Sequence, residues 1–95
     1  MMTSHGSLIA ILGAMPSIGG IPGPYRFFFY SFDCGERMHV HVRRDRAACK
    51  VWLEPIAVVW SAGFSTRELI HIRRVILEHR LRIEEAWREH CGTAE

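Results

Sequence analysis

Residues 25–44 read YRFFFYSFDCGERMHVHVRR, and their side-chain pattern sets the class of fold. The aromatic side chains in 25–33 predict a β-strand, because aromatic residues are enriched in strands. Both faces of this strand are apolar, so we expect it to be central in a sheet or covered on each side. In 38–44, strict alternation from His39 to Arg43 predicts a second strand, and the polar residues 33–37 connect the two.

Two more short strands are predicted after these. Residues 44–46 form a charged turn, and 47–53 have the pattern of a third strand. Pro55 breaks the chain, and 56–60 then fit a fourth short strand. Because strands this close in sequence usually pair with their neighbours, we expect an antiparallel meander of three or four strands.

The last element is a helix whose start carries a capping box, with Ser65 as the N-cap and Glu68 three residues later. Apolar residues recur every three or four positions over 69–87, which makes one apolar stripe. We expect the helix to end near Cys91, and a break into two helices near His79 is the alternative. The predicted fold is therefore α+β: a three- to four-stranded antiparallel sheet packed against one long C-terminal helix.

Length and composition indicate one small domain. The chain has 95 residues, of which 48% are hydrophobic, and a formal net charge of +2. These values disfavour intrinsic disorder and leave room for one thin core. Residues 1–24 are rich in Gly and Pro and contain no Asp, Glu, Lys or Arg. We interpret 1–24 as a flexible lead-in, of which 1–14 are an upstream extension, and we place a single folded domain at 25–92.

Cysteine usage and hydropathy bear on where the protein works. Cys34, Cys49 and Cys91 are an odd number of thiols without a C-x-x-C spacing. This predicts neither a disulfide framework nor a zinc finger, and it favours the reduced cytoplasm. The apolar stretch 8–15 is shorter than the ~20 residues that a membrane-spanning helix needs. We therefore expect a cytoplasmic protein without a membrane anchor.

Several short segments carry a resemblance to a known family. They are YRFFFYS (25–31), HVHV (39–42), VWLEP (51–55), GFS (63–65), EL (68–69) and EAW (85–87). In this order they resemble a prokaryotic family known as domain of unknown function 4160. The resemblance implies a small free-standing protein, often encoded beside another small protein in settings similar to toxin–antitoxin or mobile-element modules. It implies no catalytic residues.

Two positions depart from the pattern of that family. Where its members usually carry Pro-Pro before the first His, this chain has Arg37 and Met38, so the connector is less rigid and the pose of His39 less fixed. Members also tend to begin with Met-Pro shortly before the first strand. Met15 and Pro16 match that start, which supports the interpretation of 1–14 as an extension.

His39 and His41 are the candidate chemical site. Residues i and i+2 of a strand project from one face, about 7 Å apart at the backbone, so the two imidazoles are placed to share a metal ion or a phosphate. The expected role is structural, with no cofactor. A divalent metal at His39 and His41 is one alternative, and its nearest further ligands are Asp33, Glu36, Cys34 and Cys49. Ribonuclease chemistry is another, with one His as general base, the other stabilising charge on the phosphate, and Asp33 or Glu36 orienting the base.

A second candidate surface surrounds the turn after residue 43. Its members are candidates for contact with nucleic acid or a partner: Arg43, Arg44, Arg46, Lys50 and Tyr30. A solvated turn between two strands is the simpler interpretation. The apolar stripe of the helix is wide for so small a sheet, which favours a homodimer or a small operon-encoded protein partner.

Together these patterns favour a small binding module over an enzyme. We expect it to act through a protein partner or nucleic acid, in an operon of toxin–antitoxin or mobile-element type. The alternative function is a histidine-dependent ribonuclease or metal-binding enzyme that uses His39 and His41.

Overall fold

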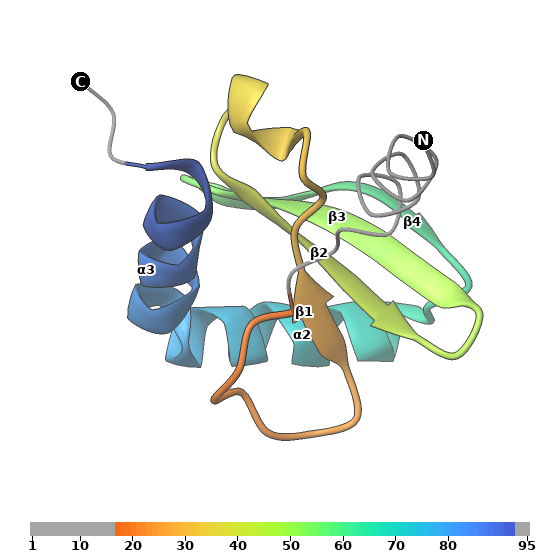
Figure 1. Ribbon diagram of the computed structural model, residues 1–95. Helices are drawn as coiled ribbons and strands as arrows, with labels where there is room; N and C mark the ends of the chain where they lie inside the picture. Colours follow the sequence, from red (N-terminus) through yellow and green to blue (C-terminus); the bar gives the residue numbers. More distant parts are fainter. Residues whose placement is uncertain (1–16, 93–95) are drawn as a thin grey trace, which may run out of the picture.

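The computed structural model describes residues 17–92, which form a four-stranded antiparallel sheet and two helices (Figure 1). In chain order the elements are β1 (Arg26–Phe28), the 3₁₀ turn η1 (Asp33–Gly35), β2 (His39–Arg44), β3 (Ala47–Leu53), β4 (Ile56–Ala62), α2 (Thr66–Glu78) and α3 (Arg80–Cys91). The strands lie in the order β1-β2-β3-β4, each antiparallel to the next. The predicted α+β fold with an antiparallel meander is confirmed.

The helical part is two helices that meet at His79, so the alternative with a break describes it better than one long helix. At the start of α2, Ser65 Oγ accepts a hydrogen bond from Glu68 N at 3.1 Å, and a Glu68 carboxylate oxygen accepts one from Ser65 N at 2.9 Å. This confirms the capping box. His79 has φ −113° and ψ 21°, outside the helical range. The change of direction brings α3 to one end of the sheet, while α2 runs across one face (Figure 1).

The first strand is shorter than the aromatic pattern predicts. Only Arg26–Phe28 pair with β2, in a register that places Phe28 opposite His41. The next aromatic residues leave the sheet, because they pack on side chains from other elements. The ring of Phe29 lies 5.4 Å from that of Trp87 and 5.6 Å from that of His90, centroid to centroid. Aromatic content therefore marks packing here as much as strand pairing.

Strand β2 presents two different faces. Val40 and Val42 are buried in the hydrophobic core with Ile72 and Ile76 of α2, and Ile83 of α3 joins the same core. The alternate residues of β2 point to the other side of the sheet, where η1 lies (Figure 1). The strand thus carries the apolar core on one face and the two histidines on the other.

The segment before β1 takes part in the core. Ile18 is buried, and its backbone N donates a hydrogen bond to Phe27 O at 2.8 Å. This differs from the expectation that the chain before residue 25 contributes little. The predicted extension, 1–14, lies outside the described residues. Within 17–92, neither helix is long and apolar enough to cross a bilayer.

Candidate functional site

The loop that follows β1 places Asp33 over the histidine face of β2. This segment, residues 30–35, is named here the η1 loop. Asp33 Oδ2 accepts a hydrogen bond from Tyr30 N at 2.7 Å, which fixes the carboxylate inside its own turn. Glu36 N donates to Asp33 O at 3.0 Å and closes the 3₁₀ turn. A carboxylate from a loop is thereby held against side chains from a strand.

Asp33 lies between the two histidines. His39 Nε2 is 3.1 Å from Asp33 Oδ1, and His41 Nε2 is 3.1 Å from Asp33 Oδ2. All three residues are buried, with 0% of His39, 2% of Asp33 and 7% of His41 exposed. Of the ligand candidates predicted beside the histidines, Asp33 is the one that lies close to both, whereas Glu36 Oε1 is 4.0 Å from His39 Nδ1.

The hydrogen bonding of His39 fixes which ring nitrogen carries a proton. His39 Nδ1 lies 2.7 Å from Arg37 O. Because a carbonyl oxygen only accepts, Nδ1 is the protonated nitrogen, and in neutral His39 the Nε2 atom has a free lone pair. That lone pair is next to the Asp33 carboxylate. Two electron-rich atoms at this distance repel each other unless a proton or a metal ion lies between them.

Neither Nε2 atom makes a hydrogen bond of acceptable geometry within the described residues, although each lies close to a carboxylate oxygen. The nitrogens and the oxygens therefore lie close together without being aligned as donor and acceptor. A buried polar atom without a hydrogen bond is uncommon and calls for a reason. Here two such atoms occur on adjacent side chains.

The protonation states follow from the same surroundings. Burial lowers the pKa of His41 below its ordinary value of 6.5, and the Asp33 carboxylate opposes this only in part. Burial works to raise the pKa of Asp33, but the Tyr30 N–H and the two imidazoles outweigh it and hold that pKa below its ordinary value of 3.8. At neutral pH the site therefore combines an ionised carboxylate with a neutral His41.

Aromatic side chains enclose the three polar residues. Phe28 stacks on His41 at 5.5 Å, and Tyr30 lies edge-on to it at 4.6 Å. On the other side, His39 has Trp52 at 5.7 Å and Trp87 at 5.2 Å. Such a shell limits the access of water and leaves any cation between the imidazoles with few competing ligands.

The remaining predicted ligands are occupied elsewhere. Glu36 pairs with Lys50, its carboxylate 2.5 Å from Nζ, and that hydrogen bond holds the pKa of Glu36 below its ordinary value. Cys49 is buried in the core, where burial raises the pKa of its thiol to about 11. Neither residue is poised to join Asp33 on a shared ion.

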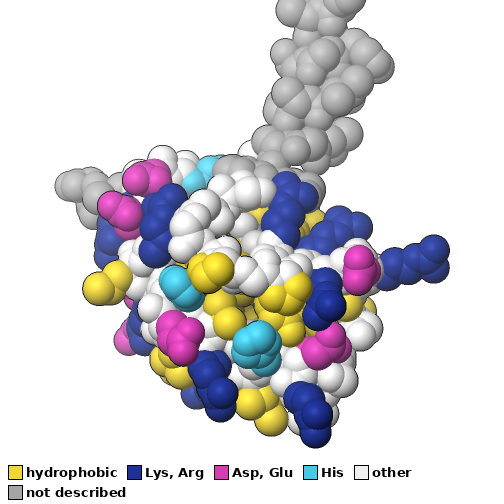
Figure 2. Space-filling view, turned by 90° about the horizontal axis from the view of Figure 1, so that it is seen from below, with side chains coloured by type: hydrophobic (Ala, Val, Ile, Leu, Met, Phe, Trp, Pro, Cys, Tyr) yellow, Lys and Arg dark blue, Asp and Glu magenta, His cyan; other side chains and the backbone are white. Residues whose placement is uncertain are grey.

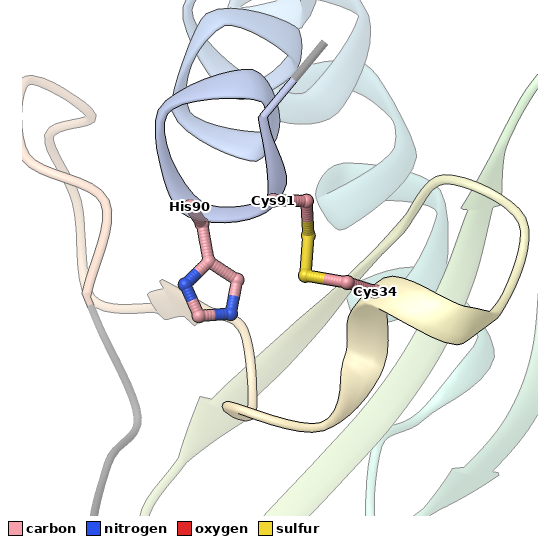
Figure 3. Close-up of side chains that lie close together, drawn as sticks. All are labelled: Cys34, His90 and Cys91. Atoms are coloured by element: carbon pink, nitrogen blue, oxygen red, sulfur yellow. A yellow bond between two sulfur atoms is a disulfide. The ribbon is translucent and has the colours of Figure 1, made fainter. Parts of the chain in front are cut away.

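The structure contains a disulfide between Cys34 and Cys91, so the prediction of no disulfide is wrong. The two residues are 57 positions apart, with their Cα atoms 5.4 Å apart. Spacing in the sequence gave no sign of the pair, because only the fold brings the η1 loop against the last turn of α3. Figure 3 shows this bond, with His90 beside it.

The candidate nucleic-acid residues divide into two groups. Arg43, Arg44 and Arg46 are exposed around the β2–β3 turn. Lys50 and Tyr30 lie beside the histidine cluster instead: Lys50 is opposite His41 in the sheet register, and Tyr30 packs edge-on to that ring. The structure therefore separates the three arginines of the turn from the two residues beside the histidine cluster.

One surface escaped the sequence analysis. A groove runs between β4 and α2, lined by Val51, Ile56, Val58, Thr66, Leu69, Ile70, Ile72 and Arg73. Val58 and Trp60 of β4 are each 45% exposed, and Ile70 of α2 is 57% exposed. The signal was present in the lack of charge from 56 to 62, but a strand at the edge of a sheet cannot be told from a buried one by that pattern alone.

Comparison with known protein families and proteins fits the resemblance in the motifs. No curated protein and no solved structure matches the chain. A family model described as a domain of unknown function matches residues 25–88, which include β1, the η1 loop, the whole sheet, α2 and most of α3. The chain belongs to this family, DUF4160.

Proposed function

We propose that this protein is a metal-binding module that holds one divalent transition-metal ion with Asp33, His39 and His41. The observation that carries the proposal is the pair of buried Nε2 atoms, each 3.1 Å from the same carboxylate and neither in a well-aligned hydrogen bond. A cation between these atoms removes the repulsion between the His39 lone pair and the carboxylate. It also satisfies two buried polar atoms at once.

The spacing of the donor atoms supports this function. One nitrogen or oxygen from each of the three residues lies within 4.8 Å of the others. In a tetrahedral zinc site with bonds near 2.0 Å, neighbouring donors are about 3.3 Å apart. The two nitrogen-to-oxygen distances of 3.1 Å are close to that value. Little movement is therefore needed to bring the donors around an ion.

The donor chemistry and its support also fit a transition metal. Two imidazoles and one carboxylate are a set that binds zinc and other borderline metals. Histidine ligands commonly donate their second N–H to a carbonyl, as His39 Nδ1 does to Arg37 O. Ligation also requires a neutral imidazole, and the lowered pKa of His41 favours that form.

In this proposal the ion fastens the η1 loop to the sheet. His39 and His41 come from β2, and Asp33 comes from the loop, so shared ligation joins two parts of the chain. The burial of all three side chains supports a structural role over turnover of a large substrate. Ribonuclease chemistry with His39 or His41 stays a prediction, and this burial is an argument against it, since a general base must reach the proton that it removes.

Zinc titration by calorimetry, with elemental analysis of the purified protein, tests the proposal. We expect one equivalent of Zn²⁺ to bind to the wild type. Asp33→Asn, His39→Gln and His41→Gln should each lose more than about 100-fold in affinity, because even second-shell changes cost 10–100-fold. His79→Gln, which removes an imidazole at the junction of α2 and α3, is the matched control. Equal zinc binding by the wild type and the three site variants would contradict the proposal.

We also propose, as a second function, that the protein binds a protein partner through the edge of β4. Seven residues of β4 form an edge of the sheet without any charged side chain, whereas the opposite edge strand, β1, has only three residues. Open edges without charge accept a further strand readily. Figure 2, seen from the side of α2, shows hydrophobic side chains in the middle of the surface and charged ones around them.

The occupant that fits this edge is an extended segment of the small protein expected to be encoded beside it, in a toxin–antitoxin-like operon of a bacterial cytoplasm. Backbone hydrogen bonds to β4 would supply affinity, and the groove beside Val58 and Ile70 would take an apolar side chain. Because the β4 edge carries no charged side chains, the partner strand needs no charged residues to pair with it. The exposed arginines at the β2–β3 turn could bind the phosphates of a nucleic acid, which would then be a further partner in such an operon.

Size-exclusion chromatography with light scattering, on a mixture of the two purified proteins, tests the second function. We expect a complex that Val58→Lys abolishes, because a charge on the edge opposes strand addition. Leu81→Lys is the matched control, since Leu81 is an exposed apolar residue of α3. A wild-type protein that elutes as a monomer and binds neither the neighbour nor nucleic acid at low salt would contradict this function.

A further inference from the structure

We propose that the Cys34–Cys91 disulfide is a redox-sensitive tether that sets the affinity of the Asp33–His39–His41 site for its metal. This inference rests on the proposed metal-binding function. When the disulfide is formed, the η1 loop is fixed and Asp33 is held in place for ligation. When it is reduced, Asp33 is less well held and the metal binds more weakly.

The arrangement follows from two consecutive residues of η1. Asp33 faces His39 and His41, while Cys34 forms the disulfide with Cys91 in the last turn of α3 (Figure 3). The two histidines lie on β2, where His41 pairs with a strand on each side and His39 pairs with Trp52 of β3, so the sheet fixes their backbone positions. Asp33 comes from a short turn, and its position depends on what holds that turn. The disulfide therefore acts on the one ligand that the sheet does not fix.

Noncovalent contacts also join this part of the chain to α3. His90 Nε2 lies 3.0 Å from Tyr30 O and donates a hydrogen bond to it. Phe29, just before the loop, packs on the rings of His90 and Trp87. The disulfide adds a covalent link to these contacts. One neutral hydrogen bond contributes less to stability than a covalent cross-link usually does.

Opening the disulfide requires a thiol reductant, and such a reductant can approach the bond. A thiolate of the reductant attacks one sulfur and forms a mixed disulfide, and a second reductant thiol then displaces the protein. Overall, the disulfide takes up two electrons and two protons to give two thiols, while the reductant is oxidised to its own disulfide. Cys34 is an exposed residue, which gives the attacking thiolate a side from which to approach the bond. Buried Cys49, with its raised pKa, is a poor participant in exchange.

The consequence for metal binding is a loss of preorganisation. Without the bond, the η1 loop gains conformational freedom, and the metal must order it again on binding. Residues that orient a ligand without touching the ion typically change metal affinity 10–100-fold. We expect a fall of that size on reduction, with His39 and His41 still in place. A reducing cytoplasm would then favour the weaker state, and oxidation would favour the tighter one.

The first test compares Zn²⁺ affinity of the oxidised wild type with that of the double variant Cys34→Ser/Cys91→Ser. Serine also removes the thiolates, which with His90 form a second group of possible metal ligands. We expect 10–100-fold weaker binding by the double variant, unchanged by a thiol reductant. Equal affinities would overturn the tether while leaving the metal site intact. If the oxidised wild type binds no zinc, both the site and the tether fail.

A second measurement separates a tether from general stabilisation by the disulfide. Linkage requires zinc to favour the disulfide form by the same factor by which the disulfide favours zinc. In a glutathione redox buffer, saturating zinc should lower the reduction potential of the pair by about 30 mV for each tenfold effect. In the Asp33→Asn variant zinc should no longer lower the potential. A potential that does not move with zinc in the wild type would overturn the proposal, whatever the melting temperature of the metal-free protein.

Discussion

The two faces of β2 use the same strand for different purposes. On one face, Val40 and Val42 pack with apolar residues of both helices, and such a core needs only side chains of suitable size and polarity. On the other face, His39 and His41 meet a carboxylate from a short loop, and this cluster depends on particular atoms at particular distances. Alternation along a single strand thus places the apolar core on one face and the proposed metal site on the other.

Truncation on the helix face should have the largest effect on stability. Leu53 is fully buried in the core beneath the helices. Leu53→Ala should lower the free energy of unfolding by about 2–5 kcal/mol, the usual cost of removing a large buried side chain. Urea denaturation measures this. Zinc affinity of the molecules that are still folded should be unchanged, and a large loss of affinity would mean that the two faces are not independent.

Removal of one ligand should affect the zinc-dependent part of stability. With free Zn²⁺ at 100 times its Kd, a bound ion stabilises the folded state by about 2.7 kcal/mol. Asp33→Asn keeps the shape of the side chain but weakens it as a ligand, so this gain should vanish. Thermal unfolding with zinc and with a chelator gives the comparison. A variant that gains as much from zinc as the wild type would show that the stabilising ion binds elsewhere.

Acid should weaken the histidine face in the metal-free protein. The pKa of His41 is lower in the folded protein than its ordinary value of 6.5, so the unfolded chain takes up a proton first as the pH falls. Stability is therefore fully present above pH 6.5 and is lost as the pH falls through the folded pKa. The pKa of Asp33 is also lowered, so its contribution is lost only below pH 3.8.

Unfolding in urea between pH 7.5 and 5, with a chelator present, measures this effect. His41→Gln should flatten the profile, because glutamine does not titrate. We expect this change to be smaller than the two above, since it concerns one imidazole at the edge of the cluster. A wild-type profile that rises toward acid would contradict the assignment of His41 as neutral.

Local patterns were sufficient to predict most of the fold. The alternation of residues predicted the position of β2, and the spacing of Ser65 and Glu68 predicted the start of α2. The aromatic run was less informative, because strand propensity does not distinguish pairing from packing. Only three of its residues pair with β2, and Phe29 packs on α3 instead.

The site was predicted in part. The i and i+2 spacing placed His39 and His41 on one face, and Asp33 was among the candidates because it is near in sequence. The sequence did not distinguish Asp33 from Glu36, since the choice depends on how the η1 loop folds back and on the ion pair that Lys50 makes. It could not show the Cys34–Cys91 bond, because a contact across 57 residues depends on the whole fold. The sequence also could not show that β4 lies at an open edge of the sheet, because the order of the strands depends on the whole fold.

Crystals of the oxidised protein grown with zinc test the central claim most directly, by anomalous scattering at the zinc absorption edge. The account predicts one strong peak between His39 Nε2, His41 Nε2 and the Asp33 carboxylate, with bond lengths near 2.0–2.2 Å. A site without zinc, in which the imidazoles hydrogen-bond directly to Asp33, would contradict it.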